Sequence, residues 1–382
     1  MAGRLRRSRY SCRPRERVGG RSNGHAPGRH RLFPSVQARV RRTALDATEC
    51  HASVVDAIVD SPRATFARPA HRGDPRCADI VQARDRMPIL TAPDIRRLVD
   101  LDIPERRQEY GTKDCILYAL GLGLGNQETD ADLGHIYERD LVPVPTQLAV
   151  LAASSDWMRD PRASIHWEQL VAISHDMVLS RPLGPSGIVR ARTTVDAVYD
   201  RGPGRGAVIH WRRVVLDEES GEEVGTIRAQ ALARADGGFG GEKPVRRCHP
   251  GFPRRAADYV TEWKTDLNQA LLYRLSGDLN PLHADPDVAR EVGFERPILH
   301  GLCNLGIAAL ATGRSWPGGL PVLRSIGARY ADVLYPGDTL KTEVWHESDV
   351  ALFRCTSLRT RNIVIDDGIA TFFDREKSAR EC

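Results

Sequence analysis

The stretch YRLSGDLNPLHADPDVAREVGFERPILHGLCNLGIAA, residues 273–309, places an acid, an amide and an imidazole within six residues. These are Asp278, Asn280 and His283. A carboxylate and an imidazole that share one water can take a proton from it and return a proton to a substrate carbon, which is general acid–base chemistry worth roughly 10²–10⁴-fold in rate. Asn280 either holds the same water or fixes a neighbouring side chain. The alternative is a purely structural role, a capped turn beside a histidine whose hydrogen bonds are satisfied, because Asp and Asn are common turn formers.

The segment before this motif, residues 266–277, shows helical spacing of apolar residues. Asp266 can cap such a helix, and Gly277 suits its C-terminal end. Asn280-Pro281 cannot continue a helix. We therefore expect the three polar side chains on a loop that projects from the end of a rigid element.

His300-Gly301 follows the imidazole of His283 after seventeen residues and opens an apolar run. Pro297 interrupts the chain, and the run after it predicts a mostly buried helix that begins near Gly301. The first N–H groups of a helix lack intrahelical acceptors and carry partial positive charge, and glycine lets a carbonyl approach the backbone closely. We expect the Gly301 N–H to stabilise an enolate-like oxygen, and losing one such donor typically costs about 10²–10³ in rate.

The two motif segments, residues 273–286 and 294–303, closely resemble the hydratase 2 motif of MaoC-like (R)-specific enoyl-CoA hydratases. The resemblance implies an α+β double hot-dog fold, in which two antiparallel sheets each wrap around a central helix. It also implies that Asp278 and His283 form the catalytic pair, that Asn280 assists, and that the N–H of Gly301 forms the oxyanion hole.

The resembling family hydrates trans-2-enoyl-CoA to (3R)-hydroxyacyl-CoA, or runs the reverse dehydration, without a metal or a redox cofactor. Which side chain of the pair takes the first proton stays open, as does the choice between acyl-CoA and acyl-carrier protein. Two alternatives are a hot-dog thioesterase and a non-catalytic acyl-thioester-binding subunit. The intact acid, amide and imidazole argue against the second, because a binding module has no use for such a set. A homodimer is compatible with the fold.

The chain divides into four predicted segments. Residues 1–86 are an Arg-rich disordered extension, 87–235 a degenerate N-terminal hot-dog, 236–256 a linker, and 257–382 the catalytic hot-dog. We expect the extension to have no role, although an arm that binds nucleic acid or an anionic surface and a mitochondrial transit peptide are alternatives.

A faint internal repeat supports this division. Tyr118-Ala-Leu aligns with Tyr273-Arg-Leu at an offset of 155, and a second pair of segments, 173–184 and 326–337, aligns at 154. The positions of the acid and the imidazole then fall on Gly123 and Glu128. The first half therefore lacks the catalytic pair, and we expect its interior to receive the acyl tail.

Alternating or β-branched runs predict antiparallel strands in both halves. They are residues 188–199, 207–216, 224–235, 323–335, 338–347, 351–360 and 363–373. His166, in the stretch before them, is predicted to be structural or tunnel-lining, because no acid partner stands beside it in the sequence.

Four residues are predicted to bind substrate. Arg329 lies in a strand that resembles the family segment leading to the CoA end, and arginine offers a planar fork of donors for phosphate. The other three are Arg324, Arg314 and His300.

Composition excludes several other functions. Residues 1–86 hold 19 Arg and no Lys against 8 acidic residues, a net +11, so the remainder carries −6 of the chain's net +5. A mildly acidic main body argues against nucleic-acid binding. The eight cysteines are scattered without a C-x-x-C pair, which favours reduced thiols in the cytoplasm over disulfides or zinc. No apolar run reaches the ~18–20 residues of a membrane span.

Overall fold

The computed structural model describes residues 95–126, 132–244, 249–316 and 322–373, which all belong to one unit, Val54–Cys382. The predicted extension, residues 1–86, lies outside the described residues.

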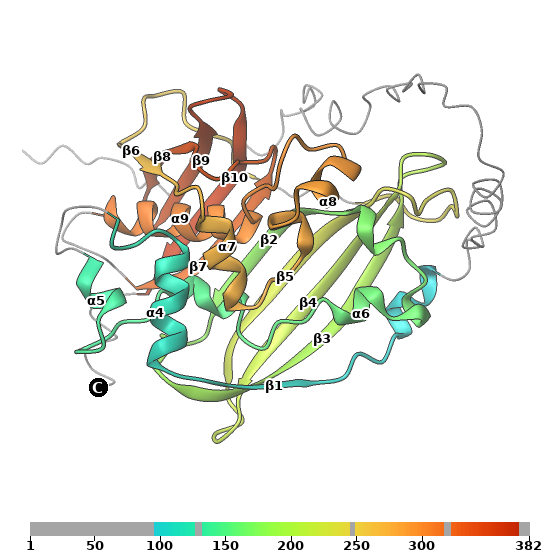
Figure 1. The fold of residues 1–382 in the computed structure, drawn as a ribbon, viewed down its shortest axis with the longest axis horizontal. Coiled ribbons are helices and arrows are strands. Elements are labelled where there is room, and N and C mark those ends of the chain that lie inside the picture. The colour runs from blue at the N-terminus through green and yellow to red at the C-terminus, as the bar shows by residue number, and fades with distance from the viewer. Residues whose placement is uncertain (1–94, 127–131, 245–248, 317–321, 374–382) are drawn as a thin grey trace, which may run out of the picture. The chain divides into compact units, whose positions relative to one another are not determined.

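Ten antiparallel strands form one continuous sheet (Figure 1). In spatial order the first half contributes β1 (Arg106–Tyr110), β3 (Gly187–Asp200), β4 (Ala207–Asp217), β5 (Glu223–Ala233) and β2 (Leu170–Leu179). The second half continues with β7 (Leu323–Tyr330), β10 (Ile363–Phe372), β9 (Val350–Ser357), β8 (Thr339–Glu347) and β6 (Tyr259–Lys264). Each half places its second strand in sequence at the centre of the sheet and its first strand at the outer edge. The internal repeat predicted from the sequence is therefore a repeat of topology.

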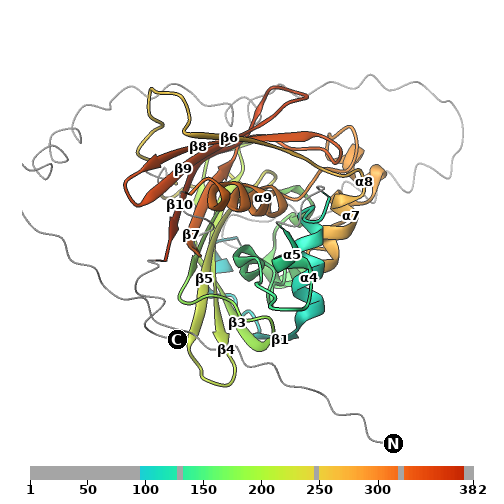
Figure 2. The same ribbon diagram turned by 90° about the vertical axis from the view of Figure 1, so that its left-hand side faces the viewer.

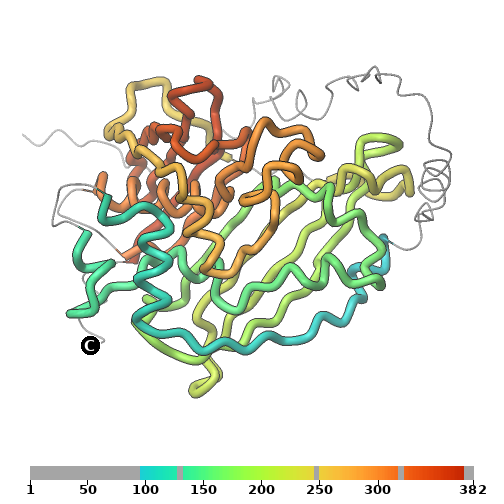
Figure 3. Tube along the Cα trace, in the orientation of Figure 1, coloured from blue at the N-terminus to red at the C-terminus, as the bar shows by residue number. Residues whose placement is uncertain are grey.

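The two halves meet at the seam between β2 and β7. These strands pair antiparallel from Ser174 opposite Arg329 to Val178 opposite Ser325. Backbone pairing across the seam leaves neither half with an open edge there, so the halves share one sheet. The described residues between β5 and β6, 234–244 and 249–258, are in yellow tones in Figure 3, and β6 lies at the far edge of the second half.

The main helices lie on the same side of this sheet (Figure 2). They are α4 (Thr112–Gly121), α7 (Gln269–Tyr273) and α9 (Gly301–Arg314). The Cα of Tyr273 lies 3.0 Å from where a Cβ on Gly121 would be, so α4 and α7 pack with their backbones close together. The aligned tyrosines of the repeat, Tyr118 and Tyr273, are fully buried with ring centroids 5.7 Å apart. The large core cluster around them draws on both halves.

The two halves differ in the helix that the sheet wraps around. The second half has the 14-residue α9, whereas the equivalent place in the first half holds only the short 3-10 helix η5 (Pro145–Ala149). Pro143 precedes it and Pro145 opens it, so neither position has an N–H to extend a helix toward the N-terminus, and Ala152 has a left-handed φ of 48° after it. The double hot-dog fold is thus confirmed, but the central helix of the first half is reduced to a turn.

The helix predicted over 266–277 is also shorter than expected. Its N-cap is Asn268 rather than Asp266, and after α7 it tightens into the 3-10 helix η8 (Arg274–Ser276). Gly277 ends it with a left-handed φ of 135°, as the sequence predicted. Leu267, Leu271 and Leu275, which contribute to the helical spacing, are exposed. Ala270 and Tyr273 instead form the face that packs on α4.

Short elements complete the fold. They are η3 (Arg97–Asp100), α5 (Leu133–Ile136), α6 (Asp156–Arg159), η6 (Pro161–Ala163), η7 (Trp167–Gln169), η9 (Pro281–His283) and α8 (Pro286–Glu291). None of the helices in the described ranges is long and apolar enough to cross a membrane.

Candidate active site

The loop after η8 is held in shape by its own polar side chains. One carboxylate oxygen of Asp278 accepts a hydrogen bond from the Asn280 N–H at 3.2 Å. The side-chain oxygen of Asn280 accepts from the Leu282 N–H at 3.0 Å and caps η9, which Pro281 opens. These bonds leave the second carboxylate oxygen of Asp278 and the amide NH₂ of Asn280 as the groups able to contact a water or a ligand.

His283 is buried, with 8% of its surface exposed, and its tautomer follows from its partner. Its Nδ1 lies 2.8 Å from the carbonyl oxygen of Ile298. Because a carbonyl only accepts, Nδ1 carries the proton, and a neutral ring then has a free lone pair on Nε2. Burial lowers the pKa of His283, although the charge of Asp278 opposes this. The ring is therefore neutral near pH 7 and can accept a proton at Nε2.

His300 ties the loop to the start of α9. This residue is the N-cap of the helix and is 1% exposed. Its Nε2 donates to the backbone oxygen of Asp278 at 3.2 Å, and its ring stacks on His283 with centroids 3.6 Å apart and planes 26° apart. Burial, together with the neighbouring His283, holds the pKa of His300 well below its usual range. Two neutral rings can stack in this way without charge repulsion.

Asp278, His283 and His300 thus converge, with one ligand-type atom from each lying within 4.8 Å of the others. Three such groups are also a familiar metal-binding set. Here the two imidazole rings are stacked, with planes 26° apart and centroids 3.6 Å apart. A cation bound to one ring would lie out of the plane of the other. This geometry suits a shared water better than a tetrahedral ion.

Gly301 occupies the first position of α9, where the N–H has no acceptor within the helix. A Cβ at this position would lie 3.1 Å from Cζ and 3.2–3.3 Å from both Cε atoms of Tyr330. A methyl group there would press on the tyrosine ring, which would have to shift by a few tenths of an ångström. The hydroxyl of Tyr330 lies 3.1 Å from Nδ1 of His175, which reaches the site from β2 of the first half.

Known proteins match both halves of this arrangement. A family model described as MaoC like domain matches residues 251–367, and one described as MFE-2 hydratase 2 N-terminal domain matches residues 108–235. The 3-hydroxyacyl-thioester dehydratase Y of Mycobacterium tuberculosis is 34% identical over 276 residues, which cover 69% of this chain and 93% of the relative. The chain belongs to the MaoC-like hydratase 2 family.

Further relatives share the same two-half organisation. The peroxisomal enoyl-CoA hydratase 2 of Arabidopsis thaliana is 34% identical to this hydratase 2 homologue, over 68% of this chain and 89% of the relative. The crystal structure of a MaoC-like dehydratase from Phytophthora capsici superimposes with a TM-score of 0.63 at 28% identity, covering 73% of this chain and 98% of that one.

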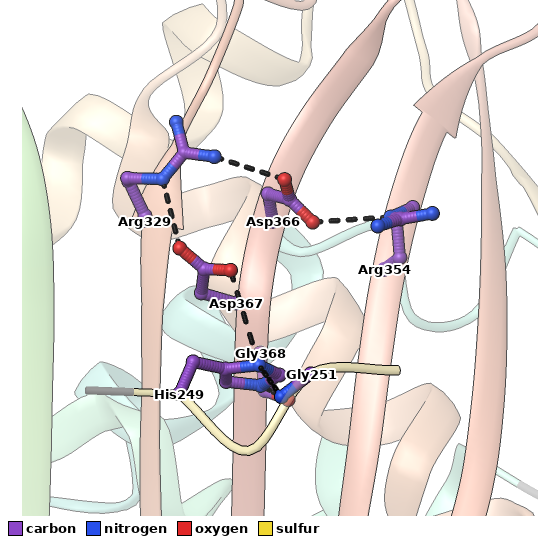
Figure 4. A network of polar contacts seen from close by, with 7 residues as sticks. All are labelled: His249, Gly251, Arg329, Arg354, Asp366, Asp367 and Gly368. Carbon is purple, nitrogen blue, oxygen red and sulfur yellow. Dashed lines mark hydrogen bonds and ion pairs between the residues drawn. The ribbon is translucent and has the colours of Figure 1, made fainter. Parts of the chain in front are cut away.

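The predicted substrate-binding arginines of this MaoC-like protein are occupied by other partners or exposed. Arg329 donates through Nε to Asp367 at 3.0 Å and through Nη2 to Asp366 at 2.9 Å, and Arg354 binds the second oxygen of Asp366 at 3.0 Å (Figure 4). Arg314 pairs with Asp132. A contact between Arg329 and a substrate phosphate stays a prediction, and Nη1 is the guanidinium nitrogen that neither aspartate occupies.

The remaining predicted groups have clear places. The guanidinium of Arg314 also covers the ring of Trp263, with 5.0 Å from Cζ to the centroid. Arg324 is exposed on β7. His300 is buried and supports the loop. Its contact with substrate stays a prediction.

The prediction that His166 has no acid partner is wrong. Its Nδ1 lies 2.6 Å from a carboxylate oxygen of Asp236, and its backbone N–H donates to the other oxygen at 3.1 Å. The Asp236 side chain is only 3% exposed. The pair clamps the chain after β5 onto the segment before β2, across 70 positions of sequence, which no local pattern indicates.

Sequence reasoning missed Tyr330 and His175. The available signal was strand alternation, which places Ile326, Ala328 and Tyr330 on the inner face of β7 and directs Arg329 to the other face. Applied to β7, this alternation would have singled out Tyr330 instead of Arg329.

Substitution of Gly301 by alanine should lower turnover at least about tenfold, because the new methyl group displaces Tyr330 or the start of α9, and small displacements at a reacting centre are costly. Steady-state kinetics and a melting curve measure the effect. Gly134→Ala is the matched control, since nothing lies within 4 Å of a Cβ there. Unchanged turnover in Gly301→Ala would show that the close contact has no role.

Substitution of Arg329 by glutamine should lower the free energy of unfolding by about 1–3 kcal/mol, because two partly buried aspartates lose charged hydrogen bonds. We expect KM to stay unchanged. Denaturant unfolding and kinetics measure both quantities, with the exposed Arg324→Gln as control. A raised KM at unchanged stability would instead support the phosphate contact predicted from the sequence.

Proposed function

We propose that this protein adds water to trans-2-enoyl-CoA to give (3R)-hydroxyacyl-CoA, and catalyses the reverse dehydration. The observation that carries the proposal is the convergence of Asp278 and His283 beside His300, the N-cap of α9, with Nδ1 of His283 bonded to the Ile298 carbonyl. Relatives named 3-hydroxyacyl-thioester dehydratase and enoyl-CoA hydratase 2 support the same chemistry, that of a hydro-lyase.

The water is held between Asp278 and His283. As its oxygen bonds to C3 of the enoyl group, a proton passes from the water to Nε2 of His283. The lone pair on Nε2 is free because Nδ1 carries the ring proton and donates it to the Ile298 carbonyl. The proton that the pair has gained then returns to C2, so that water has added across the double bond and the pair regains its starting state. Asp278 orients the water and the transient imidazolium by its charge.

The thioester oxygen gains negative charge when C3 is attacked. The N–H of Gly301 supplies a donor at the positive end of a 14-residue helix, where such charge is stabilised. Binding of this oxygen also fixes C3 relative to the water. The chemistry requires no metal or redox cofactor, and we propose that the enzyme uses none.

The first half is proposed to receive the acyl tail. The support is the reduction of its central helix to η5, which ends beside the loop: Val150, the residue directly after η5, lies within 4 Å of a Cβ placed on Gly277. A cavity of about 50 Å³ next to the loop is lined in part by Gln147, Leu151 and Ser276. A sharp loss of turnover with enoyl chains longer than four carbons would contradict this role of the first half.

The substrate carrier is proposed to be CoA, with an acyl-carrier protein as the other possible carrier of the same thioester. A homodimer and a cytoplasmic location also remain proposals, the latter because some relatives are named as peroxisomal.

The variants Asp278→Asn and His283→Asn should each lose at least about 10²-fold in kcat without unfolding. Asparagine at 283 keeps a donor near the position of Nδ1 for the Ile298 carbonyl but lacks Nε2, so the fold is preserved. Loss of enoyl absorbance follows the reaction, and a thiol reagent checks that no free CoA is released, as a thioesterase would release it.

Asp287→Asn is the control for these variants, because the side chain lies in the neighbouring α8 and is 82% exposed. Near-normal hydration by either site variant would remove that residue from the mechanism, and absence of hydration by the wild-type protein would refute the proposed function.

The pH dependence follows from the lowered pKa of His283. The ring accepts a proton only when neutral, and it becomes protonated only below its depressed pKa, so kcat/KM should hold down to pH 6.5 and fall at more acidic pH. In Asp278→Asn the carboxylate that raises this pKa is gone, so the acidic limb of the residual activity should move to still lower pH. An acidic limb centred above pH 7 would contradict the assignment.

A further inference from the structure

The ring of Tyr330 lies against Gly301, the residue whose N–H is proposed to bind the thioester oxygen. Its ring atom Cζ, which carries the hydroxyl, is the atom nearest to the position of a Cβ on Gly301, at 3.1 Å. The hydroxyl is therefore bonded to the ring carbon that lies closest to Gly301, the residue whose N–H is proposed to bind the thioester oxygen. None of the roles assigned above uses this hydroxyl.

His175 holds that hydroxyl from the other half of the protein. Its Nδ1 lies 3.1 Å from the Tyr330 oxygen, and the two rings have centroids 5.6 Å apart at 58°. Burial and the charge of Arg213 lower the pKa of His175 to about 4, while Asp278 acts in the opposite direction. His175 is thus neutral at pH 7 and close enough to the catalytic carboxylate to sense its charge.

The direction of the bond between the two rings decides what Tyr330 can do. Burial raises the pKa of Tyr330, so the phenol keeps its proton. A neutral imidazole can donate from Nδ1–H to the phenol oxygen, and the phenol proton is then free to bind a second acceptor. A carbonyl oxygen seated at Gly301 would be such an acceptor.

We propose that the Tyr330 hydroxyl is the second hydrogen-bond donor to the thioester oxygen, beside the N–H of Gly301, and that His175 positions it. This inference rests on the proposed function. Tyr330 would be a catalytic residue, because it touches the oxygen on which charge develops, and His175 a positioning residue. The first half, which lacks the acid and imidazole of the loop, would then contribute to the reaction through the β2–β7 seam.

The competing explanation is that the Tyr330–His175 bond only fastens this seam. A purely structural bond would affect stability, whereas a donor to the thioester oxygen also polarises the bound carbonyl. The two roles therefore differ in a spectroscopic property of the bound substrate as well as in rate.

The test compares wild type with Tyr330→Phe, which keeps the ring against Gly301 and removes only the hydroxyl. We expect kcat to fall about 10²-fold with little change in KM, as for the loss of one oxyanion donor. The infrared carbonyl stretch of bound enoyl-CoA labelled with ¹³C at C1 should move toward that of free substrate. Tyr199→Phe is the matched control, because the ring of Tyr199 packs on that of His210 within the first-half sheet, with ring centroids 4.9 Å apart.

A second pair of variants tests the positioning role. His175→Asn places an amide near the position of Nδ1 and should retain most of the rate, whereas His175→Leu should fall to the level of Tyr330→Phe. A wild-type rate in Tyr330→Phe, or a reduced rate with an unshifted carbonyl stretch, would overturn the inference. Failure of the wild-type protein to hydrate enoyl-CoA would instead refute the underlying function.

Discussion

The contact of His300 with the loop at Asp278 is the constraint on which the rest of the site depends. The imidazole belongs to the N-cap of α9, bonds the backbone oxygen of Asp278, and stacks on His283. One side chain thereby fixes the acid–base pair relative to the helix N-terminus. Because both rings are buried and neutral, the stack is not opposed by charge repulsion, and burial itself disfavours the protonated forms that would disrupt it.

The fold keeps this constraint rigid through close helix packing at two glycines. A Cβ on Gly306 would come within 2.6 Å of Leu122, and one on Gly121 within 3.0 Å of Tyr273, so α9 and α7 both lie directly on the end of α4. The continuous sheet supplies the other wall, since β2 and β7 pair along the line where His175 and Tyr330 meet. The two halves have diverged in the helix at their centre while keeping the same strand order. The half with the long helix carries the loop, and the half with the short turn does not.

Local pattern was enough to predict much of this arrangement. The loop at Asp278, the start of α9 at Gly301 and most strands depend on turn residues and periodicity that act over a few positions. The repeat was visible because Tyr118 and Tyr273 pack against each other at the centre of the core, where substitution is costly. The roles of the site residues remain predictions, although the structure brings Asp278 and His283 together.

Long-range contacts account for what the sequence could not indicate. The partners of Arg329 lie on β10, and the acid partner of His166 lies 70 residues away, so neither pairing leaves a local signal. The spacing of the leucines before the motif did not indicate which face of the helix is buried. Ala270 defines the buried face, because its small side chain allows close packing on α4. Desolvation, which sets the protonation of the site histidines, depends on the whole packed core and is not encoded in spacing.

The most direct test is a crystal structure with a (3R)-hydroxyacyl-CoA bound. The account predicts that the 3-hydroxyl lies within about 3 Å of both the Asp278 carboxylate and Nε2 of His283, with the thioester oxygen at the N–H of Gly301. A thioester bound with its oxygen away from the start of α9, or with its hydroxyl contacting neither side chain, would contradict the account.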